Sequence, residues 1–192
     1  MKKIGEGWQY SVYELGNGRV LKKFHGTLRS YWVIFKTIFP FKNDSPFRII
    51  PFSRGMKRTA LNSFEILKRR AIPKELIGNP VFLNELDYEQ DKTTPLAVVL
   101  NDKETVDAFV DFNKTLLSLG IIDKSFNITK NFGIDAQGNV VLIDIGEIFD
   151  DPDRIMRQRR KRAWAEHYVA GEIKDGTLRG YFLERMDKEF GL

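Results

Sequence analysis

The chain has 192 residues, of which 42% are hydrophobic, 30% charged and 12% aromatic. This length and composition suit one globular domain with a sizeable core, and exclude two full-sized domains or a disordered chain. The absence of cysteine excludes disulfides, thiol nucleophiles and cysteine–zinc sites, and two histidines are too few for most histidine-based metal sites. The 31 lysines and arginines exceed the 26 acidic residues, and the isoelectric point near 9.3 favours an anionic partner.

The N-terminal sequence contains two lysines but lacks the apolar run of a secretory signal. The longest apolar stretch, residues 31–41, is interrupted by Lys36 and Pro40 and is shorter than the roughly 18 residues of a membrane span. We therefore expect a cytoplasmic protein. Aromatic and basic residues mix over residues 26–56, which favours packing around the first sheet. The alternative is an amphipathic element on an anionic membrane, peripheral at the inner membrane surface.

The N-terminal half begins with predicted strands over residues 4–24, which meet at the turn 16–18 with its two glycines. Residues 26–56 give no clear pattern. A helix is predicted over residues 59–70, and short apolar runs predict strands at 80–83 and 96–100. The residues expected on the buried face of the helix are Ala60, Phe64 and Leu67.

The C-terminal half begins with a strongly amphipathic stretch that predicts a helix over residues 102–120. Two short strands about a turn follow within residues 131–145, and helices are predicted over 154–170 and 177–190. Strands, a helix, strands and then mostly helices indicate an α+β protein with a sheet-rich first half and a helical second half.

A glycine-rich strand precedes a lysine on the predicted hairpin. Gly5 and Gly7 would let the backbone approach a phosphate, and Lys22 on a neighbouring strand would neutralise its charge. Strand alternation places Val20 on the same face as Lys22, where it could cover a base, and turns Lys23 to solvent. Taken alone, such glycines more often mark a simple turn.

Two potential oxygen ligands flank the second hairpin. Asn131 precedes it and Asp144 ends it, within the sequence Asp-Ile-Gly-Glu. An amide oxygen and a carboxylate brought together by one hairpin suit Mg²⁺, which takes its other ligands from water and phosphate. The alternative is that both residues merely end strands. Glu65, in the helix before the central strands, is a candidate partner for Lys22, although helical glutamates are usually solvated.

The order of these motifs resembles the protein-kinase-like superfamily, which includes protein kinases, aminoglycoside phosphotransferases and lipopolysaccharide core kinases. The sequence IGEGWQYSVY is similar to the glycine-rich strand of that family, and Val20-Leu21-Lys22 to the strand with its phosphate-binding lysine. Asn131 and Asp144 match its two magnesium ligands in spacing. The resemblance covers roughly residues 4–24 and 58–150.

This resemblance implies a bilobal kinase-like fold in one domain, residues 1–192. The small β-rich N-lobe would span about 1–100 and the reduced, mostly helical C-lobe about 101–192. It also implies an ATP- and Mg²⁺-dependent phosphotransferase acting on a hydroxyl group. The implied nucleotide-binding residues are Gly5, Gly7, Val12, Val20 and Lys22, with Glu65 orienting Lys22, and the implied metal ligands are Asn131 and Asp144.

The catalytic loop departs from the family pattern. The family's catalytic aspartate lies five residues before the asparagine, a position that Phe126 occupies here. This departure from the resemblance implies an insertion in the loop, and Asp123 or, as the second choice, Asn127 would have to orient the acceptor hydroxyl. Phosphoryl transfer depends mostly on positioning and charge neutralisation, so a displaced carboxylate could serve. The alternative is a pseudokinase that works as a nucleotide-binding or interaction module.

The C-terminal half is too short for the substrate-docking half of a eukaryotic-type protein kinase. It is more similar to that of compact bacterial members such as lipopolysaccharide heptose kinases, so the expected acceptor is an anionic glycan of the lipopolysaccharide core or a protein side chain. Residues 154–162 carry six basic residues after an acidic run, which favours a capped, solvated helix over a docking face. Too few aromatic residues interleave with this patch for nucleic acid to be an expected partner.

Overall fold

The computed structural model describes residues 1–38, 49–124 and 126–191. The N-terminal half is built on a five-stranded antiparallel sheet with the strand order β1-β2-β3-β5-β4. Its strands are β1 (Lys2–Glu6), β2 (Tyr10–Glu14), β3 (Arg19–Phe24), β4 (Val81–Phe82) and β5 (Tyr88–Asp91). The strand predicted at residues 80–83 is confirmed as β4.

The predicted hairpin joins β2 to β3, and its strands pair from Tyr10 opposite Phe24 to Glu14 opposite Val20. Gly16 and Gly18 have φ values of 81° and 74°, the left-handed region that glycine adopts without strain. The hairpin makes β3 the central strand of the sheet, with β2 on one side and β5 on the other.

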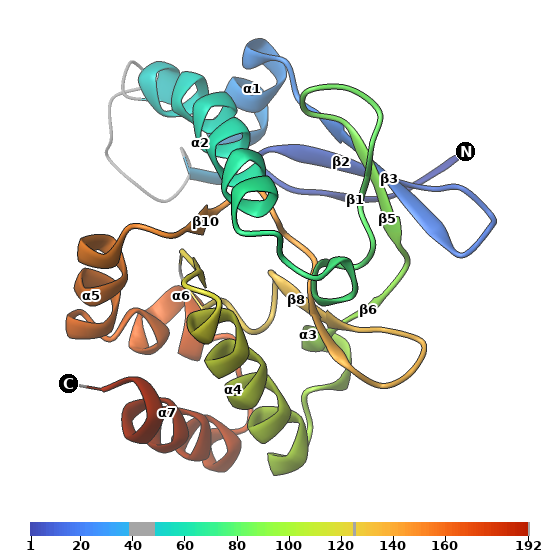
Figure 1. Ribbon diagram of the computed structural model, residues 1–192. Coiled ribbons are helices and arrows are strands. Elements are labelled where there is room, and N and C mark those ends of the chain that lie inside the picture. Colours follow the sequence, from blue (N-terminus) through green and yellow to red (C-terminus); the bar gives the residue numbers. More distant parts are fainter. Residues whose placement is uncertain (39–48, 125, 192) are drawn as a thin grey trace.

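Two helices, α1 (Thr27–Ile38) and α2 (Ile49–Arg69), lie between β3 and β4 in the chain. The helix predicted over residues 59–70 is confirmed as the second part of α2, which begins ten residues earlier. Figure 1 shows α2 lying against the sheet, where the Phe64 ring meets the Tyr88 ring edge-on at 5.6 Å. As predicted from the spacing, the buried residues on this face of α2 include Ala60, Phe64 and Leu67.

The connection between the two halves contains a 3-10 turn, η2 (Lys74–Ile77), the short strand β6 (Thr94–Pro95) and the short helix α3 (Leu96–Val99). The predicted strand over residues 96–100 is wrong, because this run forms α3. Pro95 precedes the helix with ψ of 139°, and only Leu96 is buried whereas Val98 is 72% exposed. A short apolar run without alternation does not distinguish the two structures.

The C-terminal half is mostly helical. Asp102 caps α4 (Lys103–Ser118) by accepting a hydrogen bond from the Thr105 N–H at 2.7 Å. Two strand pairs follow: β8 (Phe132–Ile134) with β9 (Val140–Leu142), and β7 (Ile122–Asp123) with β10 (Ile148–Phe149). The remaining elements are α5 (Pro152–Arg160), η3 (Ala163–Ala165), α6 (His167–Ala170) and α7 (Gly176–Phe190).

The prediction of one helix over residues 154–170 is wrong, because the chain leaves helical geometry at Arg162, with φ of 51°. This break turns Trp164 into the core, where its indole N–H donates to the Asp187 carboxylate on α7 at 2.9 Å. The Arg162 guanidinium donates to the same carboxylate. The tertiary contacts with α7 thus override the local helical pattern.

One hydrophobic core connects the two halves, from Tyr10 and Phe64 on the sheet side to Phe109, Phe132 and Trp164 among the helices. Figure 1 shows the sheet with α1 and α2 in its upper part and α4 to α7 in its lower part. The expected α+β architecture, with a β-rich N-terminal part and a mostly helical C-terminal part, is confirmed. Among the described residues, no helix is both long and apolar enough to cross a membrane.

Candidate functional site

Lys22 lies on the central strand β3 and points into the junction between the two halves. Val20 and Lys22 are buried whereas Lys23 is exposed, as the strand alternation predicts. The Lys22 ammonium donates a hydrogen bond to the backbone carbonyl of Ile143 and lies 5.7 Å from the centre of the Tyr88 ring. Burial lowers the pKa of Lys22, and the nearby negative charge of Asp144 partly opposes this effect.

Asp144 and Asn131 are held together by the backbone at the end of the second hairpin. The N–H groups of Ile143 and Asp144 both donate to the Asn131 carbonyl, at 2.8 and 3.2 Å. Asp144 Oδ1 accepts the Gly146 N–H at 3.3 Å, which fixes the orientation of its carboxylate. The hairpin therefore joins Asn131 to Asp144 through the backbone, next to the Ile143 carbonyl that accepts the hydrogen bond from Lys22.

Asn131 is oriented in turn by Asp123, the last residue of β7. The Asn131 amide donates from Nδ2 to Asp123 Oδ1 at 2.8 Å, and both side chains are buried. The second carboxylate oxygen of Asp123 accepts the Asn127 N–H at 3.4 Å. Because the amide nitrogen is engaged with Asp123, the amide oxygen is the Asn131 atom suited to a cation.

The donor chemistry of Asn131 and Asp144 fits Mg²⁺. Both supply oxygen, and Mg²⁺ typically binds one or two protein carboxylates together with water and substrate phosphates. Within residues 1–38, 49–124 and 126–191 there is no cluster of three or more acidic or histidine side chains that would form an all-protein metal cage. These two residues therefore fit a cation shared with a phosphate ligand.

Two charged residues beside this site were not identified from the sequence. Glu147 is partly buried, and this desolvation together with the charge of Asp144 raises its pKa, although Lys124 opposes the shift with an ion pair of 3.1 Å. The pairing of β7 with β10 brings them together, since the Lys124 N–H donates to the Glu147 carbonyl at 3.0 Å. The position of Glu147 directly after the Asp-x-Gly sequence was the available signal.

Gln9 is a third residue beside the site that was not identified from the sequence. Its side chain is 6% exposed, and neither polar atom of its amide has a hydrogen-bond partner among the described residues. It comes from the turn between β1 and β2 and lies on Gly146, where a Cβ atom would collide with Gln9 Oε1. The buried hydroxyl of Tyr10 also lacks a hydrogen-bond partner in the described part of the chain. Buried polar groups of this kind mark a place where a polar ligand or water is bound.

The predicted pairing of Glu65 with Lys22 is wrong. Glu65 forms an ion pair of 3.1 Å with Lys68 and its side chain is 72% exposed. It follows Phe64, which packs against the sheet, and one residue further along a helix is about 100° further round, toward solvent. Lys22 is oriented instead by a backbone carbonyl.

The glycine-rich segment forms β1 and the turn between β1 and β2. Gly5 follows an irregularity in the pairing of β1 with β2, opposite Val12, and Gly7 closes the turn by donating its N–H to the Tyr10 carbonyl at 2.8 Å. Neither glycine has a positive φ. Their contact with a phosphate and the contact of Val12 with a nucleotide stay predictions.

The loop after Asp123 has an unusual backbone anchor. Phe126 has φ of 52° and is fully buried, with its ring 5.7 Å from that of Trp164 and 5.5 Å from that of Phe190. The Asn127 side chain accepts hydrogen bonds from Thr129 and from the Lys130 N–H, so it braces the loop. These contacts fasten the loop to the C-terminal helices, and Asp123 is the carboxylate beside Asn131.

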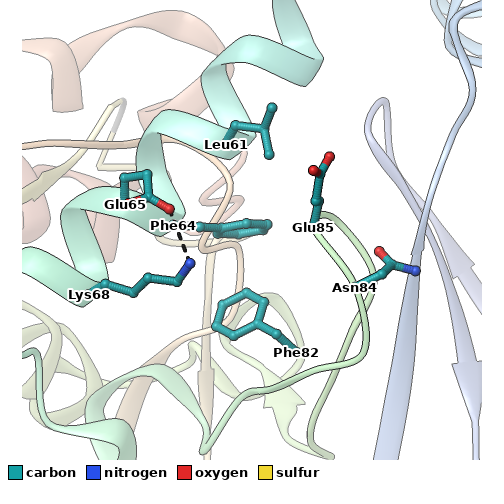
Figure 2. Close-up of a pocket in the computed structure, with 7 residues that line it drawn as sticks. All are labelled: Leu61, Phe64, Glu65, Lys68, Phe82, Asn84 and Glu85. Atoms are coloured by element: carbon teal, nitrogen blue, oxygen red, sulfur yellow. Dashed lines mark hydrogen bonds and ion pairs between the residues drawn. The ribbon is translucent and has the colours of Figure 1, made fainter.

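Two cavities lie away from this constellation. The first, of about 210 Å³, lies between α2 and the β4–β5 connection (Figure 2). Glu65 and Lys68 line one side of it, and Phe64 and Phe82 its apolar floor. The second, of about 530 Å³, lies among Arg159, Arg160 and Arg162 near the end of α7.

No protein-family model and no curated protein matches the chain. Among solved structures, the bifunctional kinase-methyltransferase WbdD is similar, with 17% identity and a TM-score of 0.46 over 94% of this chain and 44% of that one. The WbdD complex with the kinase inhibitor LY294002 has 16% identity and a TM-score of 0.44 over 96% of this chain and 45% of that one. The Rv3197–erythromycin complex from Mycobacterium tuberculosis has 12% identity and a TM-score of 0.46 over 97% of this chain and 53% of that one. The chain thus spans about half the length of these proteins, and its residue roles are argued from its own geometry.

Proposed function

We propose that this chain is a kinase-like phosphotransferase that transfers the γ-phosphate of ATP to a hydroxyl group, with Mg²⁺ as cofactor. The proposal rests above all on one observation: a buried lysine ammonium binds the backbone carbonyl of Ile143, the residue before Asp144, and the Asp144 backbone is joined to Asn131. A buried cation next to an oxygen-ligand pair is the arrangement that binds a metal-complexed polyphosphate.

In this proposal Lys22 exchanges its hydrogen bond with the Ile143 carbonyl for one with a phosphate oxygen. The desolvated ammonium is a stronger electrostatic partner there than it would be in water. Gly5 and Gly7 shape the turn above the phosphates, and Val12 and Val20 contact the base. Gln9, the unpaired amide on that turn, donates its N–H groups to the same phosphate oxygens.

Asn131 and Asp144 would hold the cation through the amide oxygen and the carboxylate. When bound, Mg²⁺ supplies charge neutralisation of the phosphates as the transferred group moves. The Asp123 hydrogen bond keeps the Asn131 amide oxygen directed away from Asp123, and the Gly146 N–H keeps the Asp144 carboxylate in one orientation.

Transfer requires the acceptor oxygen to form a bond to the γ-phosphorus while the bond from phosphorus to the bridging oxygen breaks. The hydroxyl proton passes to a carboxylate or to solvent. We assign the orientation of the hydroxyl to Asp123, the carboxylate that contacts Asn131. Its burial requires the acceptor to enter the junction, or the loop after Asp123 to open, before the hydroxyl is reached.

The acceptor is proposed to be an anionic glycan of the lipopolysaccharide-core type or, as the second choice, a protein side chain. The formal charge of +5 favours an anionic acceptor over a neutral one. The arginine-lined cavity at the end of α7 is a place where acidic groups of such an acceptor would be neutralised.

The test is transfer of labelled γ-phosphate from ATP to water and to candidate acceptors. Asp144→Ala should reduce turnover by at least a hundredfold, whereas Asp111→Ala, an exposed carboxylate on α4, should leave turnover unchanged. Turnover in Asp144→Ala equal to that of the original chain would refute the metal-binding role of Asp144.

The second candidate function is a pseudokinase that binds nucleotide without transferring phosphate. The complete burial of Asp123 and the αL backbone at Phe126 favour it, because both keep the carboxylate from an acceptor. Stabilisation by ATP with no turnover on any hydroxyl acceptor would support the pseudokinase. Turnover that depends on Asp144 would exclude it.

A further inference from the structure

The excess positive charge of the protein is concentrated in one segment. Residues 26–64 contain seven of the 31 lysines and arginines and one of the 26 acidic residues. The other residues therefore hold 24 basic and 25 acidic side chains and are close to neutral. The net charge of +5 thus arises from the part of the chain that contains α1 and the first half of α2.

The exposed face of α1 carries a stripe of two apolar residues and one basic residue. Leu28 and Trp32, four residues apart, are 82% and 58% exposed, and Lys36 continues the same face one turn further. The opposite face is closed: Ser30 and Ile34 are buried, and Ile34 packs with Met56 of α2. The stripe is therefore the outward side of a helix whose inner side is already occupied.

The first half of α2 adds three exposed basic residues: Arg54, Lys57 and Arg58. Neither these residues nor Lys36 forms an ion pair within the described ranges 1–38, 49–124 and 126–191. Arg29 differs, because it pairs with Glu6 at 2.9 Å and fastens α1 to β1. Figure 1 shows α1 beside α2 at one end of the sheet, and α1 packs against the first half of α2.

We propose that this surface, formed by Leu28, Trp32, Lys36, Arg54, Lys57 and Arg58, binds the anionic surface of a lipid bilayer. Leu28 and Trp32 would insert at the level of the headgroups, and the four basic side chains would lie over the lipid phosphates. Exposed leucine and tryptophan beside exposed basic residues is the composition of helices that lie in a membrane interface. The proposal concerns binding alone and does not depend on the proposed phosphotransferase activity.

A nucleic acid fits this surface less well, because Leu28, which is 82% exposed, has neither a charge nor a hydrogen-bond donor for a phosphate group. The arginine-rich helix α5 provides the contrast within the same chain. Arg157 and Arg160 are exposed there, but no large hydrophobic side chain between residues 150 and 170 is exposed among those described. Charge is present at both places, and only the α1–α2 surface combines it with insertable apolar groups.

The experiment is co-sedimentation of the full chain with vesicles of phosphatidylcholine alone and of phosphatidylcholine mixed with phosphatidylglycerol. We expect binding to the mixed vesicles only, and less binding as salt increases. One lysine or arginine at an anionic surface contributes roughly fivefold to the partition constant. Lys36→Gln with Arg58→Gln should therefore weaken binding by roughly 25-fold. The matched control, Arg157→Gln with Lys161→Gln, replaces two exposed basic residues in and directly after α5, changes the net charge equally and should bind like the original chain.

Insertion is measured separately, by quenching of tryptophan fluorescence with brominated lipids in the mixed vesicles. We expect quenching that Trp32→Phe removes and Trp8→Phe preserves, since Trp164 is fully buried. This readout keeps the proposal testable if a double variant folds poorly. Equal binding to neutral vesicles, an equal effect of the α5 control, or quenching that depends on Trp8 would overturn the proposal. A dimer in sedimentation equilibrium that Trp32→Ala dissociates, or binding to duplex DNA with none to mixed vesicles, would also overturn it.

Discussion

The ammonium of Lys22 donates a hydrogen bond to the backbone carbonyl of Ile143, the residue directly before Asp144. This contact joins the central strand of the sheet to the end of the second hairpin, across 121 positions of the chain. It holds a buried cation and a carboxylate on the same side of the junction without a direct ion pair between them. In the proposed function, a phosphate oxygen of the metal–nucleotide complex replaces the Ile143 carbonyl as the hydrogen-bond acceptor of Lys22.

Lys22→Met keeps the volume of the buried side chain and removes its charge. We expect the unliganded variant to be about as stable as the original chain, because replacing a buried charge with an apolar group is often close to neutral. Stabilisation by ATP, about 2.7 kcal/mol at a nucleotide concentration 100 times Kd, should disappear. Thermal unfolding with and without ATP measures both effects. Lys23→Met, on the exposed face of the same strand, should keep the full nucleotide stabilisation, and an equal loss in both variants would contradict the role of Lys22.

The two buried glutamines of the N-terminal half, Gln9 and Gln90, should differ in how much they contribute to the stability of the fold. Gln90 donates to the carbonyls of Ile77 and Leu142, so Gln90→Ala should lower the free energy of unfolding by about 2–4 kcal/mol. Gln9 has no partner among the described residues, so Gln9→Ala should change stability by less than about 1 kcal/mol and lower only the affinity for nucleotide. Urea unfolding and nucleotide titration check this pair. A large loss of stability in Gln9→Ala would mean that the amide already has a partner.

The fold could be predicted from the sequence wherever a pattern was long or a turn residue was specific. The Gly16–Gly18 turn, the apolar face of α2 and the long helix α4 met these conditions. Residues 96–100 did not, because a short apolar run is compatible with a strand or a helix. The break at Arg162 could not be predicted either, since its cause is the contact of Trp164 with Asp187 on another helix.

In the candidate site, too, local patterns could be predicted from the sequence, whereas features set by tertiary packing could not. Lys22, Asn131 and Asp144 could be proposed because strand alternation and hairpin spacing are local properties of the chain. The structure joins Asn131 to Asp144 through the backbone and Lys22 to the carbonyl of Ile143 between them. The rotation of α2 is set by packing, and it turned Glu65 outward. Gln9 is buried only by distant segments, so its residue type alone gave no signal, and for Glu147 the one signal was its position directly after the Asp-x-Gly sequence.

Two substitutions at Asp123 separate its two possible roles. Asp123→Asn can still accept the hydrogen bond from Asn131 but lacks a negative charge, whereas Asp123→Ala loses both. If Asp123 orients the acceptor hydroxyl, both variants should lose at least a hundredfold in kcat, and only Asp123→Ala should also weaken Mg²⁺-dependent nucleotide binding. Turnover in Asp123→Asn equal to the original would limit Asp123 to positioning Asn131. Kinetics and nucleotide titration on the same preparations distinguish these results.

Glu6 predicts an acid-dependent loss of stability. The ammonium of Lys3 and the guanidinium of Arg29 lower its pKa from 4.5 to about 2. Because the folded-state pKa lies below the unfolded value, this stabilisation is complete above about pH 4.5 and is lost as the pH falls toward 2. The Tm difference between the original chain and Glu6→Gln should therefore shrink over this interval. A difference that stays constant from pH 6 to pH 2 would show that the ion pairs contribute nothing.

The central claim is that Lys22, Asn131 and Asp144 bind one Mg²⁺–nucleotide complex. Titration calorimetry of a non-hydrolysable ATP analogue, with and without Mg²⁺, tests it most directly on the original chain and on Asp144→Asn. We predict that Mg²⁺ strengthens binding to the original chain at least tenfold and has no effect on Asp144→Asn. The same Mg²⁺ enhancement in both proteins, or no binding of the analogue to the original chain, would contradict the account.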